Sequence, residues 1–169
     1  MRIDRRTALR WTLAAGATGL LGGCGFHLRG SSQTTLPFKT IYLGFPDNSP
    51  LGTQLRRYIE GGGTTVVKTP QEAEAIFDVL SETRDKMILS LNSQGRVREY
   101  SLYYRFSFRV RTNGGKILLA PTQIVLKRDI SFNEAQVLSK ESEEASLYRD
   151  MQTDLVQQIL RRLAVIKTE

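Results

Sequence analysis

The fold of this chain is decided by residues 100–111, which read YSLYYRFSFRVR. Apolar or aromatic side chains alternate there with polar or cationic ones, and this period of two predicts a strand with one buried face. The apolar set is Tyr100, Leu102, Tyr104, Phe106, Phe108 and Val110, and the polar set is Ser101, Tyr103, Arg105, Ser107, Arg109 and Arg111. We expect the apolar face to lie under helices, and the exposed face to carry Arg105, Arg109 and Arg111.

Turn sequences flank this strand on both sides. Residues 92–95 (NSQG) and 113–115 (NGG) are typical of hairpin turns, in which Gly95 can take a positive φ. A strand precedes the first turn, at about residues 75–91, with a bend expected near residues 83–85. The stretch therefore predicts a run of antiparallel hairpins.

The chain returns as a strand and then ends in a helix. The strand covers about residues 116–132, and Pro121 within it predicts a bulge or an edge position. Apolar residues then recur every three or four positions, after an acidic start with Ser142 as a possible cap and before a basic end. This pattern predicts a helix at about residues 142–165.

The sequence of the N-terminal part of the domain predicts a strand, a helix and a second strand. The first strand is residues 39–44, and residues 64–68 form the second. Between them Ser49 is a good N-cap and Pro50 suits the first helical position, so the helix should cover about residues 50–61. Three glycines then end it.

These elements together predict an α+β fold over residues 39–169. The expected order is strand, helix, four strands and helix, with mostly hairpin links late in the chain. We expect a mainly antiparallel or mixed sheet with two helices packed on one face.

The first residues are typical of an export signal. Residues 1–10 are rich in arginine, and a short uncharged apolar run follows them. The run is too short for a stable transmembrane helix and ends in Leu21-Gly22-Gly23-Cys24, which resembles a bacterial lipobox. We therefore expect residues 1–23 to be a signal peptide, and Cys24 to carry a diacylglycerol and an N-acyl chain. An ordinary signal peptide with a chance cysteine is the alternative.

The residues around the cleavage site predict where the anchored protein lies. Residues 24–38 read as a lipidated tether. Gly25 follows the cysteine, where an Asp would resemble an inner-membrane retention signal, so the outer membrane is favoured. The export route stays open between Sec and twin-arginine translocation, because Arg5 and Arg6 fit either.

Composition excludes several classes of protein. One Cys and one His among 169 residues exclude an internal disulfide framework, a Cys-cluster zinc site and a multi-His metal site. The formal net charge is +7, but the expected mature chain of 146 residues carries only +4. Export to the periplasm also argues against nucleic acid as a partner.

Positive charge gathers in the hairpin region. Residues 84–128 hold ten Lys and Arg against two Asp and Glu, a net charge of +8. Such strands can bind phosphate or carboxylate groups. They can equally protect a sheet from aggregation, and both readings stay open.

The run CGFHLRG at residues 24–30 resembles the mature start of the LPS-assembly lipoprotein family, LptE. The later features agree with that family in their order along the chain. The resemblance implies two helices against a four-stranded sheet. It also implies an outer-membrane lipoprotein on the periplasmic side that plugs the LptD β-barrel, assists its assembly, and takes part in inserting lipopolysaccharide into the outer leaflet.

The resemblance also implies basic residues that bind lipopolysaccharide. Lys140 matches one such position, just before the final helix. At the other position, by the hairpin turn, this sequence has Ser93, and Arg96 and Arg98 stand nearby as substitutes. His27 has no accompanying ligands or nucleophile and is expected to have a local role beside the anchor.

Two other classes of protein were weighed against this one. A lipoprotein hydrolase is disfavoured by the single His, by the lipidated Cys and by the lack of a G-x-S-x-G elbow, so we expect no catalytic residue, no metal and no cofactor. A free-standing periplasmic lipoprotein that binds another anionic ligand is the remaining alternative.

Overall fold

The computed structural model describes residues 35–167. The predicted signal peptide, Cys24 and residues 24–34 of the predicted tether lie outside the described residues. The elements are β1 (Thr40–Gly44), α2 (Pro50–Gly61), β2 (Thr65–Val67), η1 (Pro70–Glu72), β3 (Ala75–Leu91), β4 (Val97–Thr112), β5 (Ile117–Ser131), η2 (Glu134–Gln136) and α3 (Val137–Ala164).

The strands form one mixed sheet with the order β2-β1-β3-β4-β5. β1 runs parallel to both β2 and β3, whereas β3, β4 and β5 are successive antiparallel neighbours. The predicted α+β class is confirmed, and so is the expected order of elements. The sheet has five strands where the resemblance implied four, and its shortest member is β2, which has three residues.

Helix α2 has the predicted bounds because its first turn is capped by its own sequence. The Ser49 hydroxyl accepts a hydrogen bond from the Gly52 amide at 3.0 Å, and Pro50 occupies the first turn. These contacts satisfy a helix-start donor that would otherwise lack a partner.

The long strands β3, β4 and β5 follow the predicted hairpins. β3 pairs with β4 without a shift at residues 83–85, where we expected a bend. Its register shifts lie between Val79 and Ser81 and between Ile88 and Leu91. β5 is an edge strand, and its register shifts between Leu119 and Thr122. Pro121 lies in this shift, so both its predicted edge position and its bulge are confirmed.

Helix α3 begins at Val137, five residues before the predicted start. The Asn133 side chain accepts a hydrogen bond from the Ala135 amide at 3.0 Å and starts the turn η2, which leads directly into α3. The acidic cluster that suggested a start near Ser142 therefore lies inside the helix.

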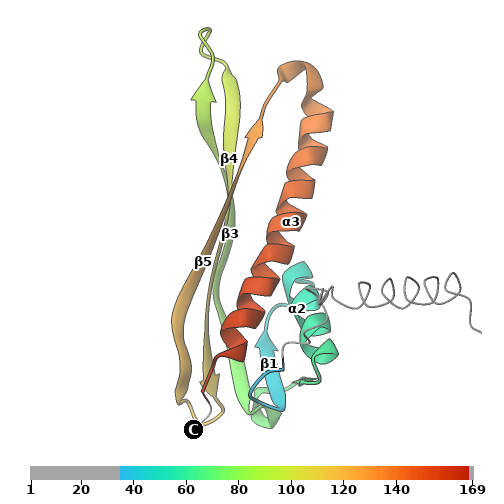
Figure 1. Cartoon of the computed structure of the whole chain (residues 1–169), viewed down its shortest axis with the longest axis vertical. Helices are drawn as coiled ribbons and strands as arrows, with labels where there is room; N and C mark the ends of the chain where they lie inside the picture. Colours follow the sequence, from blue (N-terminus) through green and yellow to red (C-terminus); the bar gives the residue numbers. More distant parts are fainter. Residues whose placement is uncertain (1–34, 168–169) are drawn as a thin grey trace, which may run out of the picture. The chain divides into compact units, whose positions relative to one another are not determined.

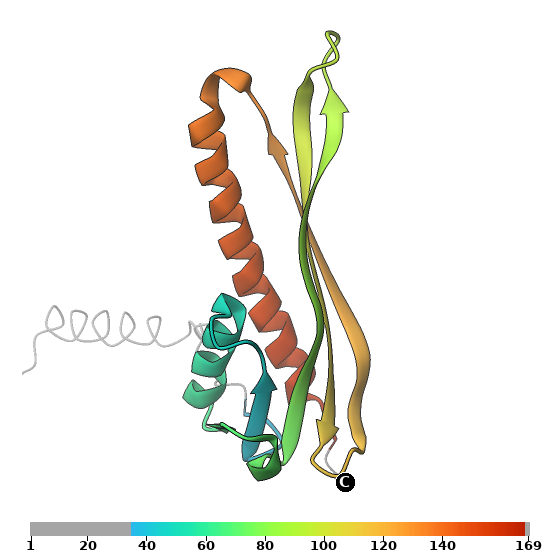
Figure 2. The same cartoon turned by 180° about the vertical axis from the view of Figure 1, so that it is seen from behind.

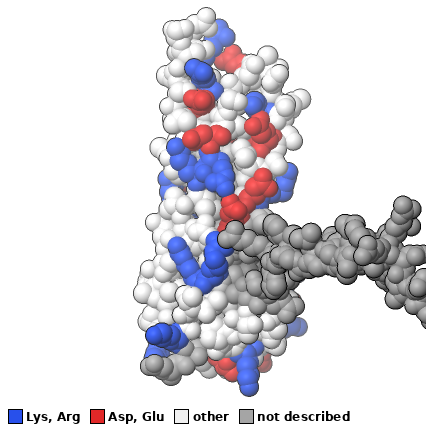
Figure 3. All heavy atoms as spheres, in the orientation of Figure 1, with Lys and Arg blue, Asp and Glu red and all other residues white. Residues whose placement is uncertain are grey.

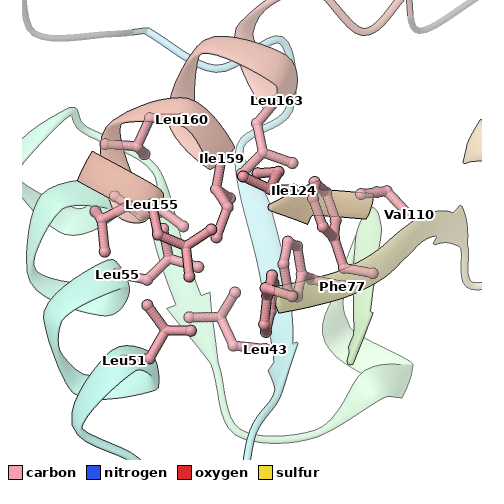
Figure 4. Packing of buried hydrophobic residues seen from close by; sticks show 14 of the residues in the cluster. Leu43, Leu51, Leu55, Phe77, Val110, Ile124, Leu155, Ile159, Leu160 and Leu163 are labelled. Atoms are coloured by element: carbon pink, nitrogen blue, oxygen red, sulfur yellow. The ribbon is translucent and has the colours of Figure 1, made fainter. Parts of the chain in front are cut away.

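The core lies where both helices cover the sheet (Figure 4). One cluster combines Leu51 and Leu55 of α2 with Leu155 and Leu163 of α3 and Phe77 of β3. Full burial of one such side chain contributes about 1.5–3 kcal/mol. The expected apolar face of β4 is buried from Leu102 to Val110, as are Leu36 and Phe38 at the end of the predicted tether.

The core does not extend along the whole of α3. All buried residues of this helix lie between Met151 and Leu163, and none lies in residues 137–150. Figure 1 and Figure 2 show the first turns of α3 and the β3–β4 hairpin tip at one end, away from α2 and β1. We call this region the hairpin end: residues 84–100 and 128–150. Within residues 35–167, neither helix is long and apolar enough to span a membrane.

Candidate functional site at the hairpin end

The hairpin turn is built by Asn92 and Gly95. The Asn92 side-chain oxygen accepts hydrogen bonds from the amides of Gln94 at 2.9 Å and Arg96 at 3.0 Å. Gly95 has a φ of +76°, a conformation that favours glycine. The predicted turn is confirmed, and it fixes where the two following arginines leave the hairpin.

The structure brings the predicted basic residues Arg96, Arg98 and Lys140 to this same end. Arg98 lies on β4 at a register shift, where the neighbouring residues Val97 and Glu99 pair with β3 and Arg98 does not. The side chain of Arg96 is 61% exposed and pairs with Glu134 of η2 at 3.3 Å. Arg98 is exposed, and no other residue of the described part of the chain forms an ion pair with its guanidinium. The two arginines therefore present charge to solvent.

Lys140 is enclosed, unlike the two arginines. Its side chain is only 16% exposed. The ammonium group donates to the Ser131 hydroxyl at 3.0 Å and to the Glu143 carboxylate at 2.8 Å. The Lys140 side chain therefore reaches from the first turn of α3 toward the end of β5. Its ammonium group is already paired with an acid of the same helix.

Between the core and the hairpin end, α3 contacts the sheet through polar and cation–π interactions. The Arg84 guanidinium lies 4.5 Å from the Tyr104 ring centroid and 5.6 Å from that of Tyr148, and donates to Gln152 at 3.1 Å. Burial, and the hydrogen bond to Glu82, raise the pKa of Tyr104; burial also raises that of Tyr148. Both phenols therefore stay protonated and neutral around Arg84.

The arginines of the opposite sheet face are neutralised by β3. Arg105 pairs with Asp85, and the Nε atoms of Arg109 and Arg111 each lie 2.9 Å from one oxygen of Asp78. Partial burial works against ionisation of Asp78, but the hydrogen bonds from the two arginines hold its pKa below the usual range. The expected exposed face does carry the three arginines, and these contacts favour the sheet-protecting alternative for them.

Charge on the face seen in Figure 3 is mixed rather than gathered into one basic patch. Figure 3 shows Lys and Arg beside Asp and Glu over the half of the domain that holds the hairpin end. The +8 of residues 84–128 is therefore offset in space by carboxylates that lie outside that stretch, among them Asp78, Glu134 and Glu144.

Sequence patterns missed one part of this end, a pocket of about 200 Å³ between the sheet and α3. Lys86 of β3 and Lys140 of α3 both line it, with Tyr100 and Phe132 among its apolar walls. The contact between Lys86 and Glu144 of α3 could not be predicted from sequence, because it depends on the sheet register and on where α3 lies. No local pattern supplies either of these. Alternation on β3 was the available signal, since it puts Lys86 on the α3 side with Ile88.

Exposed apolar side chains also gather at the hairpin end. Ile88 is 59% exposed and Leu138 is 83% exposed, and the others are Met87, Leu89 and Leu91 of β3 and Val137 of α3. Among residues 35–167, no three His, Cys, Asp or Glu side chains lie together as metal ligands would. The end thus combines cations, carboxylates and apolar groups without a metal-type cluster.

Comparison with known proteins places this architecture in a family. The family model described as LptE, lipopolysaccharide-assembly, matches residues 38–163. The LPS-assembly lipoprotein LptE of Pectobacterium atrosepticum is 28% identical over 92% of this chain and 85% of that protein. Its counterpart in Yersinia enterocolitica is 26% identical over 85% of this chain and 70% of that protein.

Solved structures share the fold. An uncharacterized lipoprotein B from Nitrosomonas europaea superposes with a TM-score of 0.71 at 40% identity, covering 83% of this chain and 90% of that one. A minor lipoprotein from Acinetobacter baumannii gives a TM-score of 0.63 at 25% identity, covering 76% and 92% of the two chains. With the family match spanning both helices and all five strands, the chain belongs to the LptE family of lipopolysaccharide-assembly proteins.

Proposed function

We propose that this chain plugs and helps to assemble an LptD-type outer-membrane β-barrel, and that it binds lipopolysaccharide through Lys140, Arg96 and Arg98. Membership of the LptE family makes it a non-enzymatic lipoprotein of lipopolysaccharide assembly.

The observation that carries the ligand proposal is the meeting of three basic residues at the hairpin end. Arg96 and Arg98 lie on one side of the turn, and Lys140 lies across from β5 on α3. Lipid A and the inner core carry phosphates and acidic sugars. Guanidinium and ammonium groups bind such anions with short, charge-assisted hydrogen bonds.

The plug proposal is supported by the outer face of the sheet. The interior of a large outer-membrane barrel is polar. Arg109 and Arg111 with Asp78, and Arg105 with Asp85, make this face charged yet locally neutral. Such a face can meet a polar barrel wall without leaving a cation unpaired.

We further propose that Cys24 carries a diacylglycerol and an N-acyl chain that anchor the protein to the outer membrane, on the periplasmic side. Several acyl chains hold a protein far more firmly than a single one. Cys24→Ala should abolish incorporation of radiolabelled palmitate. Label that persists in the variant would exclude the lipobox.

Purification from outer membranes in mild detergent tests the partner. We expect a large β-barrel protein to be recovered with the native chain in a fixed ratio. Recovery of the chain alone would rule out the plug and favour the alternative, a free-standing periplasmic lipoprotein that binds another anionic ligand.

Titration with lipopolysaccharide tests the ligand residues. The double variant Arg96→Asp with Arg98→Asp should weaken binding about tenfold, because two exposed cations become anions. Lys140→Asp should do the same, but the new carboxylate would face Glu143, so Lys140→Gln serves as a milder second variant. Arg56→Asp with Arg57→Asp on α2 is the matched control for the double variant, since it makes the same charge change on two exposed residues outside the hairpin end. Equal affinity in all these variants would exclude the proposed residues.

A further inference from the structure

Lys86 and Lys140 reach one pocket from two different elements. Lys86 comes from β3 and Lys140 from the first turns of α3, and both line the pocket of about 200 Å³. Tyr100 and Phe132 form part of its wall, with their rings packed edge to face at 5.3 Å. Two ammonium groups thus border a small space with an aromatic side, a combination suited to an anion carried on an apolar body.

Each of the two lysines is occupied by an acid of α3. The Lys86 ammonium lies 2.6 Å from the Glu144 carboxylate and 4.4 Å from the Tyr100 ring centroid. The Lys140 ammonium lies 2.8 Å from Glu143. Glu144 also lines the pocket, whereas Glu143 holds Lys140 from outside its lining. Each ammonium thus already has a carboxylate partner, and an external anion must displace that partner to bind.

These carboxylates can leave without disturbing the core. Neither Glu143 nor Glu144 is on the buried stretch of α3, which begins at Met151. Partly exposed ion pairs contribute little to the stability of a fold. Replacing the glutamate of such a pair by another anion therefore costs little free energy of folding. Lys140 is only 16% exposed, however, and leaving its ammonium group with no anion is costly. A replacement must therefore be negative, and a phosphate group offers more charge and more acceptor oxygens than a carboxylate.

We propose that Lys86 and Lys140 form a phosphate-binding pocket that Glu143 and Glu144 hold closed in the free protein. The inference rests on the proposed lipopolysaccharide binding and adds Lys86 as a further ligand residue. An entering phosphate displaces the two carboxylates and takes over both lysines. Ile88 and Leu138 are exposed at the same end, and their side chains can contact the apolar part of a ligand that carries this phosphate.

The deciding experiment titrates the folded chain with micelles of diphosphorylated lipid A. Glu143→Gln with Glu144→Gln keeps side-chain shape but removes the competing charge, and should bind about fivefold more tightly than the native chain. Lys86→Gln should bind about fivefold more weakly, and Lys86→Arg should restore binding because the cation returns. If the double glutamine variant does not fold, the single variants Glu143→Gln and Glu144→Gln replace it, each with a smaller gain.

Glu141→Gln is the matched control. Glu141 lines the same pocket on the same helix, and within residues 35–167 it forms no ion pair. A gain equal to that of the double variant would show a general change of field rather than release of the lysines, and would overturn the inference. Unchanged binding in the Lys86→Gln variant would overturn it as well.

Two further probes separate the ligand sources and the two proposals. Lipid A lacking both phosphates should bind the native chain and the double glutamine variant alike, and a persisting fivefold gain would overturn the phosphate assignment. Inorganic phosphate that matches lipid A in affinity would assign the pocket to the free anion. If neither the native chain nor any variant binds lipid A, the proposed ligand and this inference both fall. If the native chain binds it and the glutamine variants bind equally, only this inference falls.

Discussion

Gly52 sets how closely α2 approaches the chain before it. A Cβ placed there would lie 2.7 Å from Cβ and 2.8 Å from Cγ of Phe45. These atoms are close to the Phe45 backbone and cannot swing away as the end of a flexible chain could. Phe45 in turn stacks on Phe77 and Phe106, with ring centroids 5.6 and 5.9 Å away. The glycine is therefore needed for space.

Gly52→Ala should destabilise the protein by about 1–3 kcal/mol, because overpacking outweighs the gain in helix propensity. Gly61→Ala is the matched control in the same helix. Nothing lies within 4 Å of its added Cβ, so stability should rise by up to about 1 kcal/mol. Urea unfolding measures both free energies. A loss no larger for Gly52→Ala than for Gly61→Ala would mean that Phe45 moves freely.

The contrast between Ser49 and Gly52 shows what a sequence reveals at this scale. Ser49 was predicted as a cap because its role depends only on the next three residues. The constraint on Gly52 comes from where Phe45 lies after the chain has turned, and that depends on tertiary packing. Local chemistry is readable in advance, whereas close approach between segments is not.

At the scale of elements, β3 and β4 are joined by side chains as well as by their ladder. Asp78 holds Arg109 and Arg111 together, and its side chain is 22% exposed. Because its pKa is below the usual range in the folded state, the ionised carboxylate stabilises the fold. This contribution is fully present above the unfolded pKa of about 4. It is lost as the pH falls from there through the folded pKa.

Asp78→Asn should therefore lower the free energy of unfolding by about 1–2 kcal/mol at pH 7. The difference from the native chain should shrink as the pH falls below about 4. Asp150→Asn, at an exposed position on α3, is the control and should change little. A difference between Asp78→Asn and the native chain that stays constant down to pH 2 would refute the ionic role of Asp78.

Elements were predicted well where a repeating pattern ran through them and less well at their ends. Alternation along β4 identified the buried face, from Leu102 to Val110. The start of α3 was placed too late because Glu141, Glu143 and Glu144 resemble a helix start. The actual start depends on Asn133, which forms a turn before the helix pattern begins.

At the scale of the whole molecule, burial is concentrated at the end that holds α2. Residues 137–150 of α3 have no buried side chain, and their contacts to the sheet are mostly polar or ionic, such as Lys86 with Glu144. Residues 151–164 carry the helix share of the core, from Met151 to Leu163. One continuous helix thus has a half held by charge and a half held by apolar packing.

Amide hydrogen exchange should separate the two halves of α3. We expect exchange about tenfold or more faster in residues 137–150 than in residues 151–164, because opening the first half exposes only the edge of the apolar core, at Tyr148. Added salt should speed only the first half, since it screens ion pairs. Uniform protection along α3, unaffected by salt, would contradict this division.

The residues of the candidate site could be named from the sequence, but their contacts could not. The family resemblance identified Lys140, Arg96 and Arg98 as candidates. The predicted turn at residues 92–95 placed both arginines directly after it. That Lys140 is enclosed by Ser131 and Glu143, and that Lys86 shares its pocket, depends on the distance between α3 and the sheet. That distance arises from packing of the core and leaves no trace in a local pattern.

The core joins the earliest elements of the domain to the last. Leu51 and Leu55 of α2 share one cluster with Leu155 and Leu163 of α3. Because a ribosome makes the chain N-terminus first, β1 and α2 emerge long before the segment that covers them. Contacts between such distant segments also slow folding. The polypeptide therefore passes through a stage in which its first half is made but cannot yet fold, and a chain cut before Met151 stays at that stage.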